Sequence, residues 1–145
     1  MRIKNILMIL GPNLALARPC EKSMYGKETA ESIKSQITDL AERLNLKCEI
    51  FQSNWEGALI DKIQEAKNIF DGVIINAGAL SHYSYALRDA VSDARIPFVE
   101  VHTSNIFNRE DFRKVSVISE VCVGQIVGFG KASYLLALHA IREIT

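Results

Sequence analysis

Glu100 and His102 stand two positions apart in the segment PFVEVHTSN, and together they could perform acid–base chemistry. Residues two apart in a strand share a face, so the two side chains would lie together. A carboxylate beside an imidazole fixes the ring and supports its charged form, which suits proton transfer. Each residue also has a plainer interpretation, Glu100 as an edge-strand charge and His102 as a hydrogen-bonded structural histidine.

Further polar residues follow other apolar segments. Asn13 comes after Gly-Pro behind the first apolar run, and NAGALSH supplies Asn76, Ser81 and His82 behind another. Taken alone, Asn13 is a common turn residue, Asn76 and Ser81 are common helix caps, and a lone His82 is usually structural. Together with Glu100 and His102 they would bring amides, hydroxyls, imidazoles and a carboxylate to one crevice, which favours a functional site.

The elements that must position these residues alternate between strands and helices. Short apolar runs predict strands at 5–10, 47–52, 72–75, 97–101 and 115–118. Between them, apolar residues at helical spacing predict helices, and Ser53 with Glu56 has the spacing of a capping box. A short polar helix is expected around 108–112, and a last helix through YLLALHAI.

This alternation predicts an α/β fold, namely a flavodoxin-like, doubly wound, five-stranded parallel sheet with helices on both faces. In such a fold the ligand site lies at the carboxyl ends of the strands, where the polar segments fall. We expect a single domain covering residues 1–145.

Composition narrows the possible partners. Seventeen basic residues balance seventeen acidic ones, which disfavours nucleic acid and anionic membranes as partners. The apolar runs are too short to span a bilayer, and the first is interpreted as a buried strand rather than a signal peptide. Three scattered cysteines form no CxxC pair, which is typical of a reducing cytoplasm and disfavours a zinc site.

Several cofactor sites do not fit the sequence. GPNL lacks the hydroxyl residues of a flavin phosphate loop, and a phospho-receiver domain would need acidic residues at Gly11 and Asn76. GQIVGFGK matches neither a dinucleotide fingerprint nor a P-loop, so its three glycines (Gly124, Gly128 and Gly130) are interpreted as close-packing positions. We therefore expect a site that uses neither metal nor cofactor.

Across nearly the whole chain, the segments GPNL, YG, FQSNWEG, NAGALSH, ALRDA, PFVEVHTSN, REDFR and VGFG resemble, in order and spacing, the type II 3-dehydroquinate dehydratases. The resemblance implies a flavodoxin-like fold and a dodecamer built from trimers. It also implies cofactor-free loss of water from 3-dehydroquinate, giving 3-dehydroshikimate in the shikimate pathway.

The resemblance assigns the chemistry to four residues. Tyr25, as tyrosinate, would remove the proton next to the ketone, and Asn13 would hold a water that stabilises the enolate. His102, oriented by Glu100, would protonate the departing hydroxyl.

The resemblance also assigns substrate binding. The substrate's hydroxyls and carboxylate would be held by main-chain donors near Thr103 and by the side chains of Asn76, His82, Ser104 and Arg113, the last being a natural fork for a carboxylate. Asp89 would reach a neighbouring subunit.

The loop 11–26 departs from the family pattern. The family carries an arginine five residues before the tyrosine, where this chain has Cys20. A phenol titrates near 10, so a tyrosinate base needs a nearby cation. Arg18 could supply it and Lys22 is a weaker candidate, although both could equally be solvated loop charges.

Two hypotheses of different class follow. Either Arg18 replaces the usual arginine in an active dehydratase, or the chain binds a quinate-like ligand with little turnover. A generic module that binds another polyhydroxylated acid is a third possibility.

Overall fold

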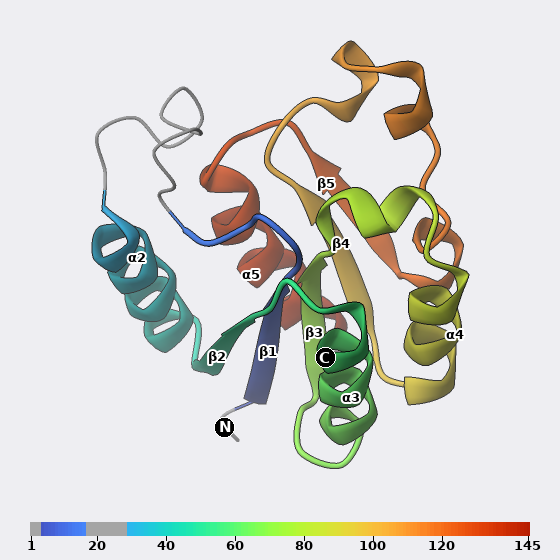
Figure 1. The fold of residues 1–145 in the computed structure, drawn as a ribbon. Helices are drawn as coiled ribbons and strands as arrows, with labels where there is room; N and C mark the ends of the chain where they lie inside the picture. Colours follow the sequence, from blue (N-terminus) through green and yellow to red (C-terminus); the bar gives the residue numbers. More distant parts are fainter. Residues whose placement is uncertain (1–3, 17–28) are drawn as a thin grey trace.

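The computed structural model describes residues 4–16 and 29–145, and these residues form one parallel sheet (Figure 1). Its strands lie in the order β2-β1-β3-β4-β5, and every neighbouring pair is parallel. The strand bounds are β1 (Lys4–Leu10), β2 (Leu46–Gln52), β3 (Gly72–Asn76), β4 (Phe98–His102) and β5 (Gly124–Val127). This is the doubly wound order 2-1-3-4-5, so the predicted fold class is confirmed.

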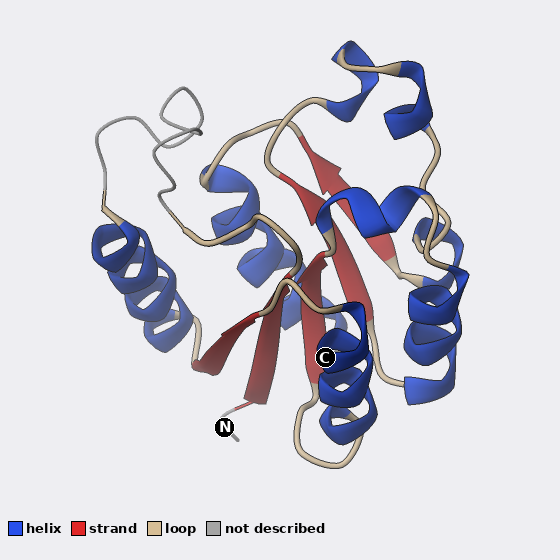
Figure 2. Cartoon of the chain, in the orientation of Figure 1, coloured by secondary structure: helices blue, strands red, loops and turns tan. Residues whose placement is uncertain are grey.

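Helices cover both faces of the sheet (Figure 2). On one face lie α2 (Ala30–Arg43) and α5 (Ala132–Ile144), and on the other lie α3 (Glu56–Ala66) and α4 (Tyr85–Ala94). Among the described residues no helix is long and apolar enough to cross a bilayer.

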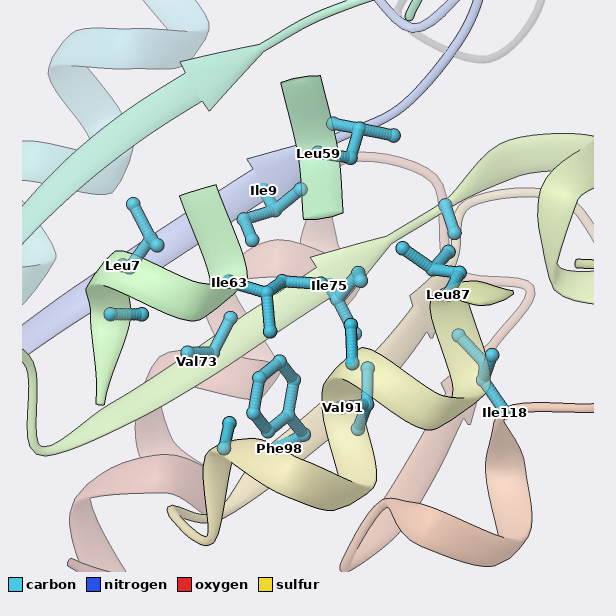
Figure 3. Packing of buried hydrophobic residues seen from close by; sticks show 14 of the residues in the cluster. Leu7, Ile9, Leu59, Ile63, Val73, Ile75, Leu87, Val91, Phe98 and Ile118 are labelled. Atoms are coloured by element: carbon cyan, nitrogen blue, oxygen red, sulfur yellow. The ribbon is translucent and has the colours of Figure 1, made fainter. Parts of the chain in front are cut away.

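Each face of the sheet has its own apolar core. Side chains of β1, β3 and β4 pack on one face with α3 and α4, as Leu59, Ile63, Leu87 and Val91 illustrate (Figure 3). On the opposite face Ile6, Met8 and Val101 pack with α2 and α5. Cys122 is partly buried against the first core and Cys48 against the second. The central strands read as uniform apolar runs because they are buried on both sides.

Two helices start at residues with a side-chain cap, whereas the one predicted cap is absent. Thr29 caps α2 by accepting from the amide of Ser32, and Ser84 caps α4 in the same way. The predicted capping box of Ser53 and Glu56 does not form, because α3 begins only at Glu56. The Ser53 hydroxyl instead accepts from the Trp55 amide, and the Glu56 carboxylate accepts from the Ser84 hydroxyl at 2.7 Å.

The predicted fifth strand at 115–118 was wrong. These residues form no strand, and the fifth strand is β5, which pairs with β4 at the edge of the sheet. The apolar side chains at 115–118 were misleading because Val117 and Ile118 bury themselves in the α3–α4 core from a loop. β5 gave a weak signal because its residues are only half-buried or exposed.

Two smaller expectations also need correction. The single polar helix expected around 108–112 is two short 3₁₀ turns, η3 (Ile106–Asn108) and η4 (Asp111–Lys114). Gly124 is not a close-packing position, since a Cβ there would meet nothing within 4 Å. Gly128 and Gly130 have φ values of 99° and 58°, which glycine tolerates best, so they serve turn geometry.

Candidate active site

A cavity of about 230 Å³ opens at the carboxyl edge of the sheet, where β1, β3 and β4 end. Seven predicted site residues line it: Asn13, Asn76, His82, His102, Thr103, Ser104 and Arg113. The wall also contains six residues that were not predicted: Pro12, Leu14, Gly78, Ala79, Ile106 and Arg109. The three segments after β1, β3 and β4 therefore meet where the topology predicted, and the REDFR segment joins them.

The Glu100 carboxylate lies behind His102 and is fully buried. Its Oε2 is 2.5 Å from His102 Nε2, so the predicted pair is formed. Ser116 and Gln125 donate to the same carboxylate, at 2.8 and 3.0 Å. A buried carboxylate needs such donors. Because Nε2 is bound to Glu100, Nδ1 is the ring nitrogen of His102 that remains for other contacts.

His82 faces His102 across the cavity wall, with ring centroids 5.9 Å apart and planes at 20°. His82 Nδ1 lies 2.7 Å from the carbonyl oxygen of Val115. A carbonyl only accepts, so Nδ1 carries the hydrogen and Nε2 of the neutral ring is an acceptor. Burial lowers the pKa of His82, and the charges of His102 and Arg113 lower it further, against the opposing effects of the Val115 bond and Glu100.

Asn13 sits in a turn that the end of β2 holds in place. Its φ of 66° is left-handed, a conformation that asparagine adopts more readily than most residues. The Asn13 amide donates to Asn54 Oδ1 at 3.0 Å, and the Gln52 side chain donates to the Gly11 carbonyl at 3.1 Å. Gly11 packs so closely that a Cβ would lie 2.7 Å from the Ala77 carbonyl oxygen. The FQSN segment thus supports the GPN turn.

Asn76 is held at the end of β3 by two side-chain hydrogen bonds. Its Nδ2 donates to the hydroxyl of the fully buried Tyr134 at 3.1 Å, and its Oδ1 accepts from the Gly78 amide at 3.1 Å. These two bonds fix which way the side-chain amide faces. Asn76 can therefore present a polar group of fixed orientation to the cavity.

Two arginines, four residues apart in REDFR, give the cavity positive charge. Arg113 pairs with Glu110 at 3.1 Å, and Arg109 donates to Ser104 Oγ at 3.2 Å. The amide of Glu110 itself and then Arg113 and Arg109 lower the pKa of the Glu110 carboxyl. Arg109 was not predicted as a site residue, although it opens the REDFR segment that also contains Arg113.

Not every predicted site residue lines the cavity: Ser81 is buried and is not part of its wall, and Glu100 lies behind His102. Tyr25 and Arg18 lie outside the described residues, as does Cys20. Asp89 is exposed on α4 and does not line the cavity. Within residues 4–16 and 29–145 there is no cluster of three histidine, cysteine or acidic side chains able to hold a metal ion.

The described cavity is suited to a small polar anion. Guanidinium groups can pair with a carboxylate, and the amide and neutral imidazole can bind hydroxyls. The buried carboxylate–imidazole pair can hold and deliver a proton. These are the functions that a proton-transfer enzyme requires.

Comparison with known proteins shows which family the chain is similar to. A family model described as dehydroquinase class II matches residues 4–142. A 3-dehydroquinate dehydratase of Bacillus cytotoxicus is 51% identical over 141 residues, which are 97% of both chains. The crystal structure of type II dehydroquinase from Butyrivibrio crossotus has a TM-score of 0.90, with 46% identity over 96% of this chain and 97% of that one. The type II dehydroquinase of Propionibacterium acnes also has a TM-score of 0.90, with 35% identity over 99% of both chains.

Proposed function

The chain belongs to the dehydroquinase class II family, and we propose that the cavity at the carboxyl edge of its sheet is where it dehydrates 3-dehydroquinate. The reaction is that of a hydro-lyase in the shikimate pathway and yields 3-dehydroshikimate and water. Relatives named as this dehydratase are about half identical over nearly the full chain, which favours turnover over the binding-only alternative.

One observation carries the assignment of the site. The buried Glu100 carboxylate lies 2.5 Å from His102, and His102 opens onto a cavity that also contains Arg113. Arg113 is placed to take the substrate's carboxylate, with the charge of Arg109 beside it. Elimination of water next to a ketone needs an acid close to a bound anion, and this arrangement provides both.

The first step is removal of the proton next to the ketone. Tyr25, as phenolate, takes the proton, and the electrons of the broken C–H bond move into the enolate. Asn13 holds a water that donates to the enolate oxygen. The turn that supports Asn13 fixes it through Asn54 and so prepares this position in advance.

The second step is departure of the hydroxyl. The enolate electrons form the new carbon–carbon double bond as the C–O bond breaks. The leaving hydroxyl takes a proton from His102, with Glu100 compensating the imidazolium charge until then, and departs as water. The proton on Tyr25 then returns to His102 through solvent, so the cycle consumes no other reactant.

Binding of the substrate's hydroxyls falls to neutral groups. The Nε2 acceptor of His82 can take a hydroxyl hydrogen, because Nδ1 is already bound to Val115. Asn76 and Ser104 supply further polar groups at the wall, and main-chain donors near Thr103 complete the set. We propose that charged side chains contact the substrate only at its carboxylate and where charge develops during the reaction, and that neutral groups bind its hydroxyls.

For the loop 11–26, we propose that Arg18 supplies the cation that lowers the pKa of Tyr25, in place of the arginine that Cys20 replaces. Each unit of that shift corresponds to about 1.4 kcal/mol. Lys22 is the weaker candidate for the same role.

The test is enone formation from 3-dehydroquinate, followed by ultraviolet absorbance. His102→Ala should lower kcat by roughly 10² to 10⁴, as loss of a general acid does. Arg18→Ala should lower kcat by about tenfold or more, because each unit by which the pKa of Tyr25 rises leaves about tenfold less phenolate. Lys22→Ala is the matched control in the same loop.

Full turnover in His102→Ala would reject His102 as the proposed acid. An unchanged kcat in Arg18→Ala would exclude Arg18 as the cation. A loss of kcat in Lys22→Ala alone would reassign that role to Lys22. A wild-type protein that binds quinate-like acids without forming the enone would revive the binding-only hypothesis.

Three further proposals concern the whole protein. Residues 1–145 form a single domain, supported by one sheet with a core on each face. The chain assembles as a dodecamer of trimers in which Asp89 reaches the site of a neighbouring subunit. The location is the cytoplasm, supported by the scattered cysteines.

A further inference from the structure

Residues 115–117, which we call the imidazole strap, contact the supports of both cavity histidines. Val115 accepts from His82 Nδ1 at 2.7 Å, and Ser116 donates to the Glu100 carboxylate that binds His102. One short loop therefore reaches both rings, although none of its three residues lines the cavity.

The hydroxyl of Ser116 has its orientation fixed by its own bonds. It accepts from the amides of Ile118 and Ser119 at 3.3 and 3.2 Å. A hydroxyl has two lone pairs and one hydrogen, so the hydrogen is left to point at Glu100. It lies 3.0 Å from Oε1 and 2.8 Å from Oε2.

Loss of this donor would leave one carboxylate oxygen without support. Within the described part of the chain, Ser116 is the only donor to Glu100 Oε1. Glu100 Oε2, by contrast, also has hydrogen bonds with His102 and Gln125. Glu100 is fully buried, so water cannot readily substitute. The carboxylate plane, and with it the imidazole, would lose its fixed direction.

The strap is itself anchored to the frame. The Val117 amide donates to the Ser81 carbonyl at 2.7 Å, and the Val117 carbonyl accepts from Arg88 at 3.0 Å. Arg88 also pairs with Glu120 at 2.6 Å. These contacts connect the strap to η2 (Gly78–His82) and to α4.

We propose that Ser116 is a positioning residue for the dehydration: with Gln125 it fixes the Glu100 carboxylate and thereby the direction in which His102 delivers its proton. This rests on the role proposed for His102. Ser116 touches neither substrate nor the reacting atoms, so its loss should alter proton delivery more than substrate binding.

The test compares Ser116→Ala with two matched variants. Ser116→Thr keeps the hydroxyl, and Ser119→Ala removes a neighbouring hydroxyl that bonds the Ser116 carbonyl instead of Glu100. We expect Ser116→Ala to lower kcat roughly 10- to 100-fold, the usual cost of losing a group that orients an active one. KM should stay within about twofold, Ser116→Thr should restore most of kcat, and Ser119→Ala should match wild type.

Two further measurements separate positioning from folding. ¹⁵N NMR of the His102 ring should show a changed tautomer balance or loss of the downfield Nε2–H signal in Ser116→Ala. The loss of kcat caused by Ser116→Ala should be several-fold smaller in a Glu100→Gln background, because both residues act through His102. If Ser116→Ala folds poorly, Gln125→Met removes the other donor from the exposed edge strand and should also lower kcat with KM kept.

Several results would overturn the inference. Ser116→Ala with wild-type kcat beside an inactive His102→Ala would reject the role of Ser116 and leave the proposed function standing. Equal losses in Ser116→Ala and Ser119→Ala, with an unchanged His102 ring signal, would indicate a merely structural loop. An active His102→Ala would reject both proposals.

Discussion

The two cavity imidazoles are alike in type and close in space, yet their partners make them different. His82 donates to a neutral carbonyl, which leaves it a neutral ring with an acceptor nitrogen. His102 faces a carboxylate, which compensates a positive ring. The 5.9 Å between their centroids also makes it unfavourable for both rings to be positive at once.

At this scale we predict that His82 makes stability depend on pH. Its pKa in the folded chain lies below the ordinary 6.5, mainly because of burial. Below about pH 6.5 the unfolded chain therefore binds a proton that the folded chain resists, so stability falls as pH falls until the folded-state pKa is passed. Chemical unfolding at pH 7.5 and 5.5 should show wild type losing more stability than His82→Gln.

An equal loss in both proteins would contradict this prediction. NMR titration of His82 provides a direct check, since its midpoint should lie below that of an unfolded peptide. His139→Gln, which changes a histidine on α5 away from the cavity, is the control.

At the scale of elements, the site depends on turns placed by neighbouring strands. The GPN turn after β1 lies between the Ala77 backbone on one side and Gln52 and Asn54 on the other. A Cβ at Gly11 would overlap backbone atoms, which cannot move as a flexible side chain can. Strand ends thus bring the turn to the cavity, and close packing sets its final position.

We predict opposite effects for two glycine substitutions. Gly11→Ala should destabilise the fold by about 1 to 3 kcal/mol through overpacking and lower turnover by displacing Asn13. Gly57→Ala should stabilise it by about 0.5 to 1 kcal/mol, because Gly57 lies in α3 with open space around it. Urea unfolding and steady-state turnover measure both, and a neutral Gly11→Ala would contradict the tight turn.

The same scale shows what sequence could and could not predict. Buried parallel strands give uniform apolar runs, so four strands were predicted to within a residue or so of their bounds. The half-exposed β5 gave no such run. Residues 115–118 have the apolar pattern of a strand but form a loop. Residues at strand ends were predicted to meet in the cavity, but Ser116 and Gln125 reach Glu100 through contacts between distant segments, which no local pattern encodes.

At the scale of the whole molecule, two exposed aromatic side chains stand at the helix starts that follow β2 and β3, on the same carboxyl edge of the sheet as the cavity. Trp55 and Tyr85 are 76% and 68% exposed at the starts of α3 and α4. The Ser84–Glu56 hydrogen bond links these two helix starts.

We predict a particle of about twelve times the 16.2 kDa chain in native mass spectrometry. If Asp89 serves a neighbouring site, Asp89→Ala and His102→Ala should each have low turnover alone. Unfolding and refolding them together should restore part of it, because some sites then combine an intact His102 with an intact Asp89.

A monomeric mass would reject the assembly. A mixture no more active than its components would reject a shared site, and mixing His102→Ala with itself is the matched control.

The two partly buried thiols give the sheet a separate chemical reporter on each face. Burial, with Glu49 and Glu100 nearby, raises the pKa of Cys48 and of Cys122 to about 12. At a given pH each is therefore about a thousandfold poorer in reactive thiolate than an ordinary cysteine. Opening of either helical layer removes that suppression, so a rise in the alkylation rate of one thiol reports loosening of the layer that packs against it.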